Sequence, residues 1–306
     1  MEKVIVVIGP TSVGKTKMGV ALAKKFNGEV ISGDSMQIYK QMDITAKVTE
    51  EEKEGIIHHC VDILNPDETY SVHDFQQTVR KKITEITQRG HVPIIVGGTG
   101  LYIKAALYDY QFDEMENDHH AINEKYKDYT NEQLHDHLKS IDEESAKILH
   151  FNNRRRVLRA IEIYETTGKR KSEMLEEQEH ICLYDAYFVG LTLPRDVLYE
   201  RINKRVDVMM ENGLKEEMDC LYSQGLIRNH QSMKAIGYKE WFDYYDHQID
   251  LNDVLELIKK HSRQYAKRQY TWFKNQFDVH WYDVNLENFE QTIEQVTDDI
   301  EKILKV

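Results

Sequence analysis

Four short runs of apolar residues occur in the first 191 positions of the chain, and stretches with helical spacing separate them. The runs are VIVVI at 4–8, EVIS at 29–32, PIIV at 93–96 and YFVGL at 187–191. They are rich in β-branched residues and lack strict alternation with polar residues, which is typical of parallel strands buried on both faces. We therefore predict an α/β fold in which a parallel sheet is flanked by crossover helices.

The pattern changes between the third and fourth runs. Residues 111–183 contain no convincing strand, are highly charged, and show helical spacing in LHDHLKSI (134–141) and VLRAIEIY (157–164). We interpret this segment as an all-helical domain inserted into an α/β core. The core would then comprise residues 1–110 and 184–306.

The region after the fourth run is expected to be mostly helical. Pro194 stands where the first position of a helix favours proline, and Gly213 stands where a helix would stop. These two residues bracket one long helix. From about residue 214 to residue 306 the pattern remains mostly helical.

Composition and charge restrict the cellular setting. The 306 residues are 41% apolar, enough for a large core, and the net charge of −13 disfavours indiscriminate binding to polyanions. No apolar run approaches the roughly 18 residues that cross a bilayer, and Glu2 and Lys3 leave no room for a signal peptide. The three cysteines are widely separated and form no CxxC pair, which argues against structural zinc. We expect a cytoplasmic monomer that does not bind membranes.

A glycine-bounded loop follows the first predicted strand. GPTSVGKT matches the G-x-x-x-x-G-K-[ST] pattern of P-loops in nucleotide-binding and ATP-binding proteins, and a predicted helix follows it as that pattern requires. Backbone N–H groups of such a loop converge on phosphate oxygens, Lys15 adds a positive charge, and the Thr16 hydroxyl can ligate Mg²⁺. A diphosphate leaving group suits the loop as well as ATP, and a glycine turn without a ligand is the structural alternative. The residues expected around the phosphates are Gly9, Pro10, Thr11, Ser12, Val13, Gly14, Lys15 and Thr16.

Polar residues also follow the next two strands that this pattern predicts. Asp34 comes after the run at 29–32, and Thr99 comes after the third run and the pair Gly97-Gly98. Ligands of open α/β sheets bind at the carboxyl edge where these residues lie. Asp34 could accept a proton, support Mg²⁺ or only cap the next helix, and the glycines could admit a ligand or serve packing alone. No Asp ends the third run, which weakens an ATP-hydrolase interpretation.

Basic residues concentrate in two segments. One is residues 154–171, and the other, KKHSRQYAKRQYTWFK at 259–274, mixes six Lys or Arg with four aromatic residues. We interpret both as surfaces that follow nucleic-acid phosphates, with aromatic rings available to stack on unpaired bases. The alternative is a solvated helix face, with Tyr265 and Trp272 seven residues apart in the core. The adjacent histidines at 58 and 59 cannot share a strand face, so we expect them to be structural rather than metal ligands.

These motifs together resemble bacterial tRNA dimethylallyltransferases. GPTSVGKT, GDSMQIY, HHCVDILNPDETYSVHDFQ, IIVGGTGLYIKA, AIGYKE and RQYAKRQYTWF occur here in the order in which that family carries them. The resemblance implies transfer of a dimethylallyl group from dimethylallyl diphosphate to N6 of the adenosine immediately 3′ of the anticodon in tRNA, with release of diphosphate and dependence on Mg²⁺. It also implies that the inserted domain holds the anticodon stem-loop. The zinc finger of eukaryotic relatives has no counterpart.

The chemistry and the resemblance together assign roles to individual residues. The lone pair of an adenine amine is delocalised into the ring, so a base must help to remove its proton, and Asp34 is the candidate. By resemblance Arg205 helps Lys15 to neutralise the leaving diphosphate, with Mg²⁺ on Thr16. By the same resemblance Thr99 and Ser35 orient the target base, and Met36 and Gln37 complete its surroundings. The residues expected to contact tRNA are Asp34, Ser35, Met36, Gln37, Thr99, Arg154, Arg155, Arg156, Arg159, Lys267 and Arg268.

Two other functions share some of these features. A P-loop kinase acting on a small molecule or nucleoside would explain residues 1–110, but not the basic half of the insertion or the basic aromatic segment at 259–274. A regulatory nucleotide switch that binds RNA would need the strand-end Asp that is absent. Prenyl transfer to tRNA is therefore the predicted function.

Overall fold

The computed structural model describes two compact units. The described residues are 1–110, 119–176 and 180–304. The larger unit comprises Met1–Tyr108 and Cys182–Val306, and the smaller comprises Asp109–Ile181. The sequence placed the limits of the inserted segment at 111 and 183.

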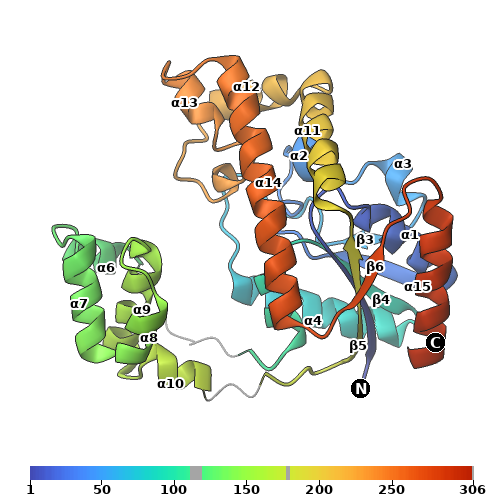
Figure 1. Ribbon diagram of the computed structural model, residues 1–306, viewed down its shortest axis with the longest axis horizontal. Coiled ribbons are helices and arrows are strands. Elements are labelled where there is room, and N and C mark those ends of the chain that lie inside the picture. The colour runs from blue at the N-terminus through green and yellow to red at the C-terminus, as the bar shows by residue number, and fades with distance from the viewer. Residues whose placement is uncertain (111–118, 177–179, 305–306) are drawn as a thin grey trace. The chain divides into compact units, whose positions relative to one another are not determined.

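A parallel sheet forms the centre of the larger unit (Figure 1). Its described strands are β1 (Lys3–Ile8), β2 (Gly28–Ser32), β3 (His58–His59), β4 (Val92–Val96), β5 (Asp185–Thr192) and β6 (His280–Asp283). Their order across the sheet is β3-β2-β4-β1-β5-β6. The predicted α/β class is confirmed, and the four apolar runs lie in β1, β2, β4 and β5.

The two strands that the apolar pattern does not reveal lie at the edges of the sheet. Among the strands that the structure describes, β3 pairs with β2 alone and β6 pairs with β5 alone. The chain after residue 214 is mostly helical, as expected, but it also contains β6, which the sequence analysis did not predict. An edge strand has one neighbour and needs no long apolar run, so neither HH nor HWYD shows the pattern of a buried strand.

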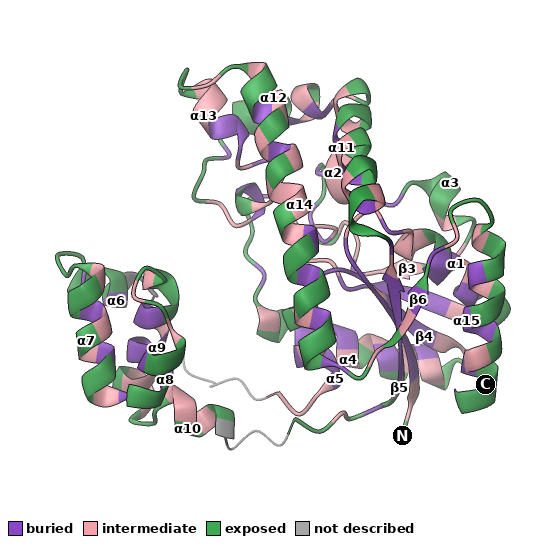
Figure 2. Ribbon diagram, viewed as in Figure 1, coloured by how far each residue is buried: buried purple, intermediate pink, exposed green. Residues whose placement is uncertain are grey.

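The core lies on both faces of the sheet, as Figure 2 shows by the buried strands between helices. Val4, Val6 and Ile8 of β1 belong to one apolar cluster, while Ile5 and Val7 belong to a second. The first cluster includes side chains from α4 (Val72–Gln88), α5 (Gly100–Leu107) and α14 (Leu251–Gln276). The second includes side chains from α1 (Lys15–Lys25) and α15 (Phe289–Leu304). Because successive strand residues point to opposite faces, a strand covered on both sides is largely apolar along its length.

The remaining helices of the larger unit follow β2 or β5. They are α2 (Asp43–Ala46), α3 (Glu50–Lys53), α11 (Arg195–Glu211), α12 (Leu214–Ser223), a 3₁₀ turn at Ser232–Lys234 and α13 (Trp241–Tyr245). α11 is the long helix that the sequence bracketed. Pro194 is its N-cap rather than its first helical residue, and Gly213, with φ of 97°, lies between α11 and α12.

The described residues of the smaller unit form helices joined by short turns and contain no strand. Its helices are α6 (His119–Lys125), α7 (Asn131–Ile141), α8 (Glu143–Ile148), α9 (Arg154–Thr167) and α10 (Lys171–Glu176). The two predicted helical stretches lie in α7 and α9, which contribute Leu134, Leu138, Val157 and Ile161 to a separate apolar core. Thr130 caps α7 by accepting a hydrogen bond from the Gln133 N–H, while the Gln133 side chain accepts one from the Thr130 N–H.

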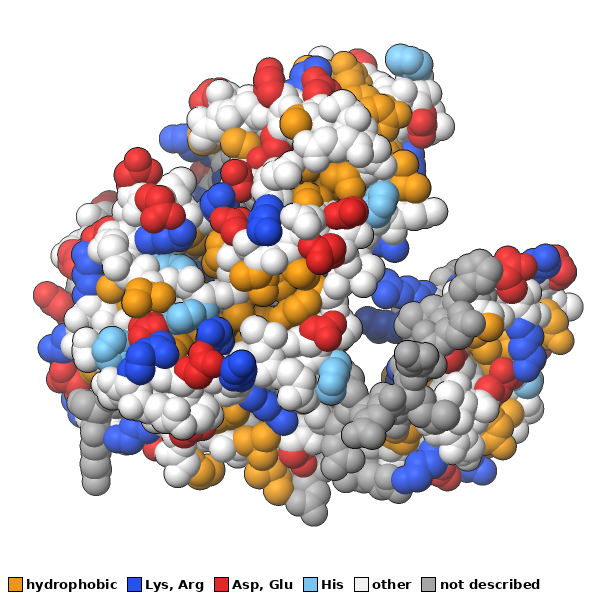
Figure 3. Space-filling model, turned by 180° about the vertical axis from the view of Figure 1, so that it is seen from behind, with side chains coloured by type: hydrophobic (Ala, Val, Ile, Leu, Met, Phe, Trp, Pro, Cys, Tyr) orange, Lys and Arg blue, Asp and Glu red, His pale blue; other side chains and the backbone are white. Residues whose placement is uncertain are grey.

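Charges of both signs are interspersed on the face of the protein shown in Figure 3. No helix within the described ranges combines the length and the apolar character needed to cross a bilayer.

A buried glutamate ties β2 to its neighbours at the amino end of the sheet. Glu29 is only 2% exposed and lies within 2.6 to 2.8 Å of nitrogen atoms of His59, Arg89 and His91. Burial alone would raise the pKa of Glu29, but the hydrogen bonds from Arg89 and His59 dominate and lower it to about 2. His59 therefore has a structural role, as predicted, while the ring of His58 lies on the other face of the strand.

Glu29→Gln should lower the free energy of unfolding at neutral pH by on the order of 3 kcal/mol, because the folded state binds the ionised form of Glu29 preferentially. A lowered folded-state pKa gives stability that is present above the unfolded pKa near 4.5 and is lost as pH falls toward 2. Urea unfolding of both proteins between pH 7 and pH 3 checks this. A difference that stays constant across that range would contradict it.

Candidate active site

The loop between β1 and α1 adopts the backbone geometry of an anion-binding turn. Gly9, Ser12 and Gly14 have φ of 147°, 66° and 107°, so the chain curls back on itself before α1 begins at Lys15. A Cβ atom on Gly9 would lie 2.6 Å from the carbonyl oxygen of Leu191, which makes glycine necessary there. The loop therefore brings its amide groups and the first turn of α1 to the carboxyl end of the sheet.

Lys15 lies half-buried inside this loop. Its Nζ donates a hydrogen bond to the Pro10 carbonyl at 2.8 Å. Burial is the main cause that lowers the pKa of Lys15, the nearby carboxylate of Asp34 partly opposes it, and Arg205 adds to the lowering, so that the resulting pKa is about 8. Lys15, Asp34 and Arg205, predicted from three different parts of the chain, thus act electrostatically on one another.

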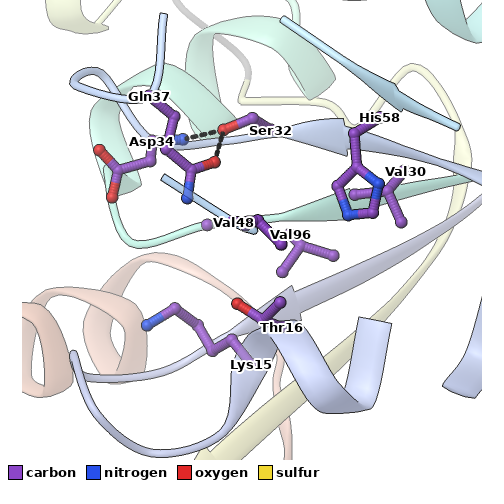
Figure 4. A pocket seen from close by; sticks show the side chains of 10 residues that line it. Lys15, Thr16, Val30, Ser32, Asp34, Gln37, Val48, His58 and Val96 are labelled. Carbon is purple, nitrogen blue, oxygen red and sulfur yellow. Dashed lines mark hydrogen bonds between the residues drawn. The ribbon is translucent and has the colours of Figure 1, made fainter. Parts of the chain in front are cut away.

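A cavity opens between this loop and the turn after β2 (Figure 4). Lys15 and Thr16 line one side of it, and Ser32, Asp34 and Gln37 line the other. The rest of the lining consists of Val30, Val48, His58, Val96 and Gly97. One part of the cavity is therefore polar and charged, while another part is largely apolar.

Hydrogen bonds within the turn after β2 hold Asp34 in place. Its Oδ1 accepts from the Met36 N–H at 2.9 Å, and its own N–H donates to Ser32 Oγ at 3.2 Å. Ser32 Oγ in turn donates to Gln37 Oε1 at 2.5 Å. The next helix, α2, begins at Asp43 with Met42 as its N-cap, so Asp34 does not cap a helix. The capping alternative is wrong, and Asp34 instead stabilises a local turn.

Thr99 and Ser35 meet at this edge. Thr99 Oγ1 accepts a hydrogen bond from the Ser35 N–H at 3.1 Å and donates one to Ser35 Oγ at 3.3 Å. The turn after β4 is therefore joined to the turn after β2, and residues 64 positions apart in sequence become neighbours.

The glycines after β4 serve close packing. A Cβ on Gly97 would lie 2.2 Å from the carbonyl carbon of Gly33, and one on Gly98 would lie 2.2 Å from Nε2 of Gln269. The space that a side chain would need at either position is thus filled by protein. Packing therefore accounts for Gly98, whereas Gly97 both packs closely against Gly33 and lines the cavity.

Arg205 lies on α11, and its Nη2 donates to the Thr45 carbonyl at 2.8 Å. Arg201, one turn earlier, donates from Nε to the Ser12 carbonyl of the loop at 3.0 Å. Sequence reasoning missed Arg201, although it lies four residues before Arg205 on the same helix, a spacing that places both on one face.

The second basic segment forms much of α14, and its two faces differ. Lys267 and Arg268 are exposed, whereas the rings of Tyr265 and Trp272 are half-buried. Tyr265 donates a hydrogen bond from its hydroxyl to the Gly98 carbonyl, and Trp272 lies against Gly100. These two aromatic residues therefore pack on the turn after β4, as the core alternative predicted.

The basic residues of α9 divide into two groups. Arg155 and Arg156 are exposed. Arg154 donates to the carbonyls of Tyr129 and Tyr126, both at 2.7 Å, and Arg159 forms a 2.8 Å ion pair with Glu162. Arg154 and Arg159 thus support the fold of the smaller unit. Arg155 and Arg156 are therefore the better candidates for RNA contact on α9.

Thr16 is the candidate metal ligand at this edge. Among the residues that the structure describes, no three His, Cys, Asp or Glu side chains gather closely enough to hold an ion. The Thr16 hydroxyl at the end of the loop fits Mg²⁺ that is also bound by phosphate oxygens, since Mg²⁺ is commonly held in this shared way.

Comparison with known proteins agrees with the motifs. A model of the family described as IPP transferase matches residues 37–276, and one described as isopentenyl transferase matches residues 2–62. A tRNA dimethylallyltransferase of Bacillus cereus is 54% identical over 287 residues, which cover 92% of this chain and 90% of that protein.

Solved structures show the same similarity in three dimensions. The tRNA Δ2-isopentenylpyrophosphate transferase of Staphylococcus epidermidis is 47% identical, with a TM-score of 0.74 over 99% of both chains. A eukaryotic dimethylallyltransferase acting on tRNA is 32% identical, with a TM-score of 0.86 over 99% of this chain and 79% of that one. Since the family model covers most of the sequence and the relatives match nearly all of it, this chain belongs to the IPP transferase family of tRNA prenyltransferases.

Proposed function

We propose that this protein transfers the dimethylallyl group of dimethylallyl diphosphate to N6 of the adenosine immediately 3′ of the anticodon in tRNA and releases diphosphate. The observation that carries the proposal is the meeting of Lys15, Asp34 and Thr99 at one edge of the sheet, in a chain of the tRNA prenyltransferase family. The kinase alternative is not favoured, because the relatives are named as prenyltransferases.

The cavity suits an allylic diphosphate. The loop amides, Lys15 and Arg205 would hold the diphosphate, and the valine side chains of the lining would accommodate its five-carbon chain. When bound at Thr16, Mg²⁺ would supply further positive charge to the departing diphosphate. Positive groups that are already in place before the C–O bond breaks stabilise the charge that develops there.

The acceptor side would be organised by the turns after β2 and β4. Asp34 would accept the N6 proton while the nitrogen forms its bond to C1 of the dimethylallyl group, and the Thr99 hydroxyl would orient the base. The target base would have to leave its stack, which costs least in an open loop. Asp34 is held by its turn within the cavity and can therefore meet an extruded base without rearrangement.

A ligand panel tests the proposal directly. Dimethylallyl diphosphate with Mg²⁺ should raise the melting temperature more than ATP or GTP does, because a true ligand stabilises the folded state by mass action. Labelled dimethylallyl diphosphate should transfer its label to a tRNA transcript with adenosine 3′ of the anticodon, and not to one with guanosine there. Phosphate transfer from ATP without prenyl transfer would favour the kinase instead.

The pKa of Lys15 predicts how donor use depends on pH. Lys15 holds diphosphate only when protonated, and its lowered pKa of about 8 means that this form is lost as pH rises through that value. A phosphate ester is already fully ionised there, so its own titration does not interfere. We expect kcat/KM for dimethylallyl diphosphate to fall about tenfold per pH unit above pH 8 to 9. A flat profile to pH 10 would show that the charge of Lys15 does not matter.

The exposed arginines of α9 should account for part of the salt dependence of tRNA binding. Replacing Arg155 and Arg156 by Gln should weaken binding and reduce the slope of log K against log [salt] by about one unit for each lost phosphate contact. Lys139→Gln, an exposed substitution on α7, is the control. An unchanged slope in the double variant would remove these arginines from the RNA surface.

A further inference from the structure

A single buried amide on α14 connects two loops of the candidate active site. Gln269 is 5% exposed, and both ends of its side chain are hydrogen-bonded. Its Oε1 accepts from the Thr11 N–H at 3.0 Å, and its Nε2 donates to the Gly98 carbonyl at 2.9 Å. The loop that would hold the donor and the turn that leads to Thr99 are thus joined through one side chain.

The strands alone do not make this connection. β1 and β4 pair through Val7 and Val96, and the Gly97 N–H then donates to the Val7 carbonyl at 3.1 Å. Beyond that bond, the chain after β1 enters the loop, whereas the chain after β4 turns into α5. Gln269 spans the two segments where they separate.

The fit around Gln269 is tight. A Cβ on Gly98 would lie 2.2 Å from its Nε2 and 3.9 Å from Nζ of Lys15, and a Cβ on Gly100 would lie 2.2 Å from the ring of Trp272. Only glycine at 98 and 100 lets α14 approach this closely. The turn after β4 is therefore held against α14, and Lys15 lies beside the same contact.

We propose that Gln269 is a positioning residue that sets the distance between the diphosphate-holding loop and the turn that carries Thr99. This inference rests on the proposed function, because it concerns the alignment of a donor with an acceptor base. Chemistry between two bound substrates depends steeply on their separation, and a misplacement of about 1 Å can cost on the order of 100-fold in rate. Binding of each substrate alone depends on its own loop and is affected far less.

Two substitutions test this role. Gln269→Met keeps the length and burial of the side chain but removes both hydrogen bonds. Gln269→Asn keeps the amide on a stem one methylene shorter, which cannot reach both partners. We expect each variant to lose about 10- to 100-fold in single-turnover transfer, while the dissociation constants for dimethylallyl diphosphate and for tRNA stay within about threefold of wild type. Gln264→Met, an exposed change on the same helix, should leave all three values unchanged.

The outcomes separate positioning from a merely structural role. A transfer rate of Gln269→Met within twofold of wild type, or a loss that follows the dissociation constants, would overturn the proposal, and so would full activity of Gln269→Asn. Hydrogen exchange of the Thr11 amide gives a readout that does not need activity, and it should be faster in Gln269→Met. If the wild-type protein transferred no prenyl group, the proposed function would be wrong. If the exchange rate of the Thr11 amide were unchanged in Gln269→Met, only the connection through Gln269 would be refuted.

Discussion

Asp34→Asn should slow prenyl transfer by about 100-fold or more in single-turnover experiments with saturating dimethylallyl diphosphate and Mg²⁺. Asn has nearly the same size and can still accept the hydrogen bond that Asp34 Oδ1 receives from the Met36 N–H. The turn should therefore persist, and the melting temperature should stay close to that of wild type. What the amide cannot do is accept a proton from N6 of adenine. Affinity for tRNA should change much less than the rate.

The control for Asp34 is an acidic residue outside the cavity. Asp67 is exposed, and Asp67→Asn should leave both rate and stability unchanged. An Asp34→Asn enzyme that keeps more than about half the wild-type rate would falsify the assignment of Asp34 as base. Asp34 would then be only the residue that stabilises the turn after β2.

Lys15→Ala should reduce transfer by about 100- to 1,000-fold, while tRNA binding survives. Lys15 lies within the loop beside the cavity, and removal of one preorganised charged donor from a site that stabilises a leaving group costs about 10²- to 10³-fold in related cases. The exposed arginines of α9 and the exposed basic residues of α14 remain intact in this variant. Filter binding of tRNA and single-turnover transfer, measured on the same preparation, separate the two effects.

Lys17→Ala is the matched control for Lys15. Lys17 lies on the same helix but is exposed, and it pairs with Glu290 at 3.6 Å on the surface. Its removal should change neither transfer nor tRNA affinity by more than about twofold. If Lys15→Ala lost tRNA affinity and kept its turnover, the loop would serve the RNA and not the diphosphate.

Local patterns were sufficient for much of the fold. The four central strands were predictable because each is covered on both faces and is therefore largely apolar, and β1 shows this with five fully buried residues in succession. The loop after β1 was predictable because its shape depends on consecutive residues, chiefly Gly9, Gly14 and Lys15. β3 and β6 were not, since an edge strand is defined by pairing with a neighbour rather than by its own composition.

The candidate site could be predicted only in part. Asp34 and Thr99 could be predicted because each lies just after a predicted strand, and the carboxyl ends of parallel strands lie at one edge of the sheet. The two basic segments could be recognised in the sequence from their Lys and Arg residues. Charge alone, however, could not distinguish the exposed Arg155 from Arg154, which donates hydrogen bonds to two backbone carbonyls of its own unit. Which arginines remain available depends on the partners that the fold brings near.

The sequence by itself determined the class of fold, the loop at Gly9–Thr16 and the family, because these depend on consecutive residues or on motifs in order. Only the tertiary structure decided how the site is held together. Thr11 and Gln269 are 258 positions apart, and their hydrogen bond exists because α14 packs against the turn after β4. Gly98 likewise looked suited to a ligand, yet the space beside it is taken by Gln269. Such contacts depend on which distant segments of the chain pack together, and a local sequence pattern does not contain that information.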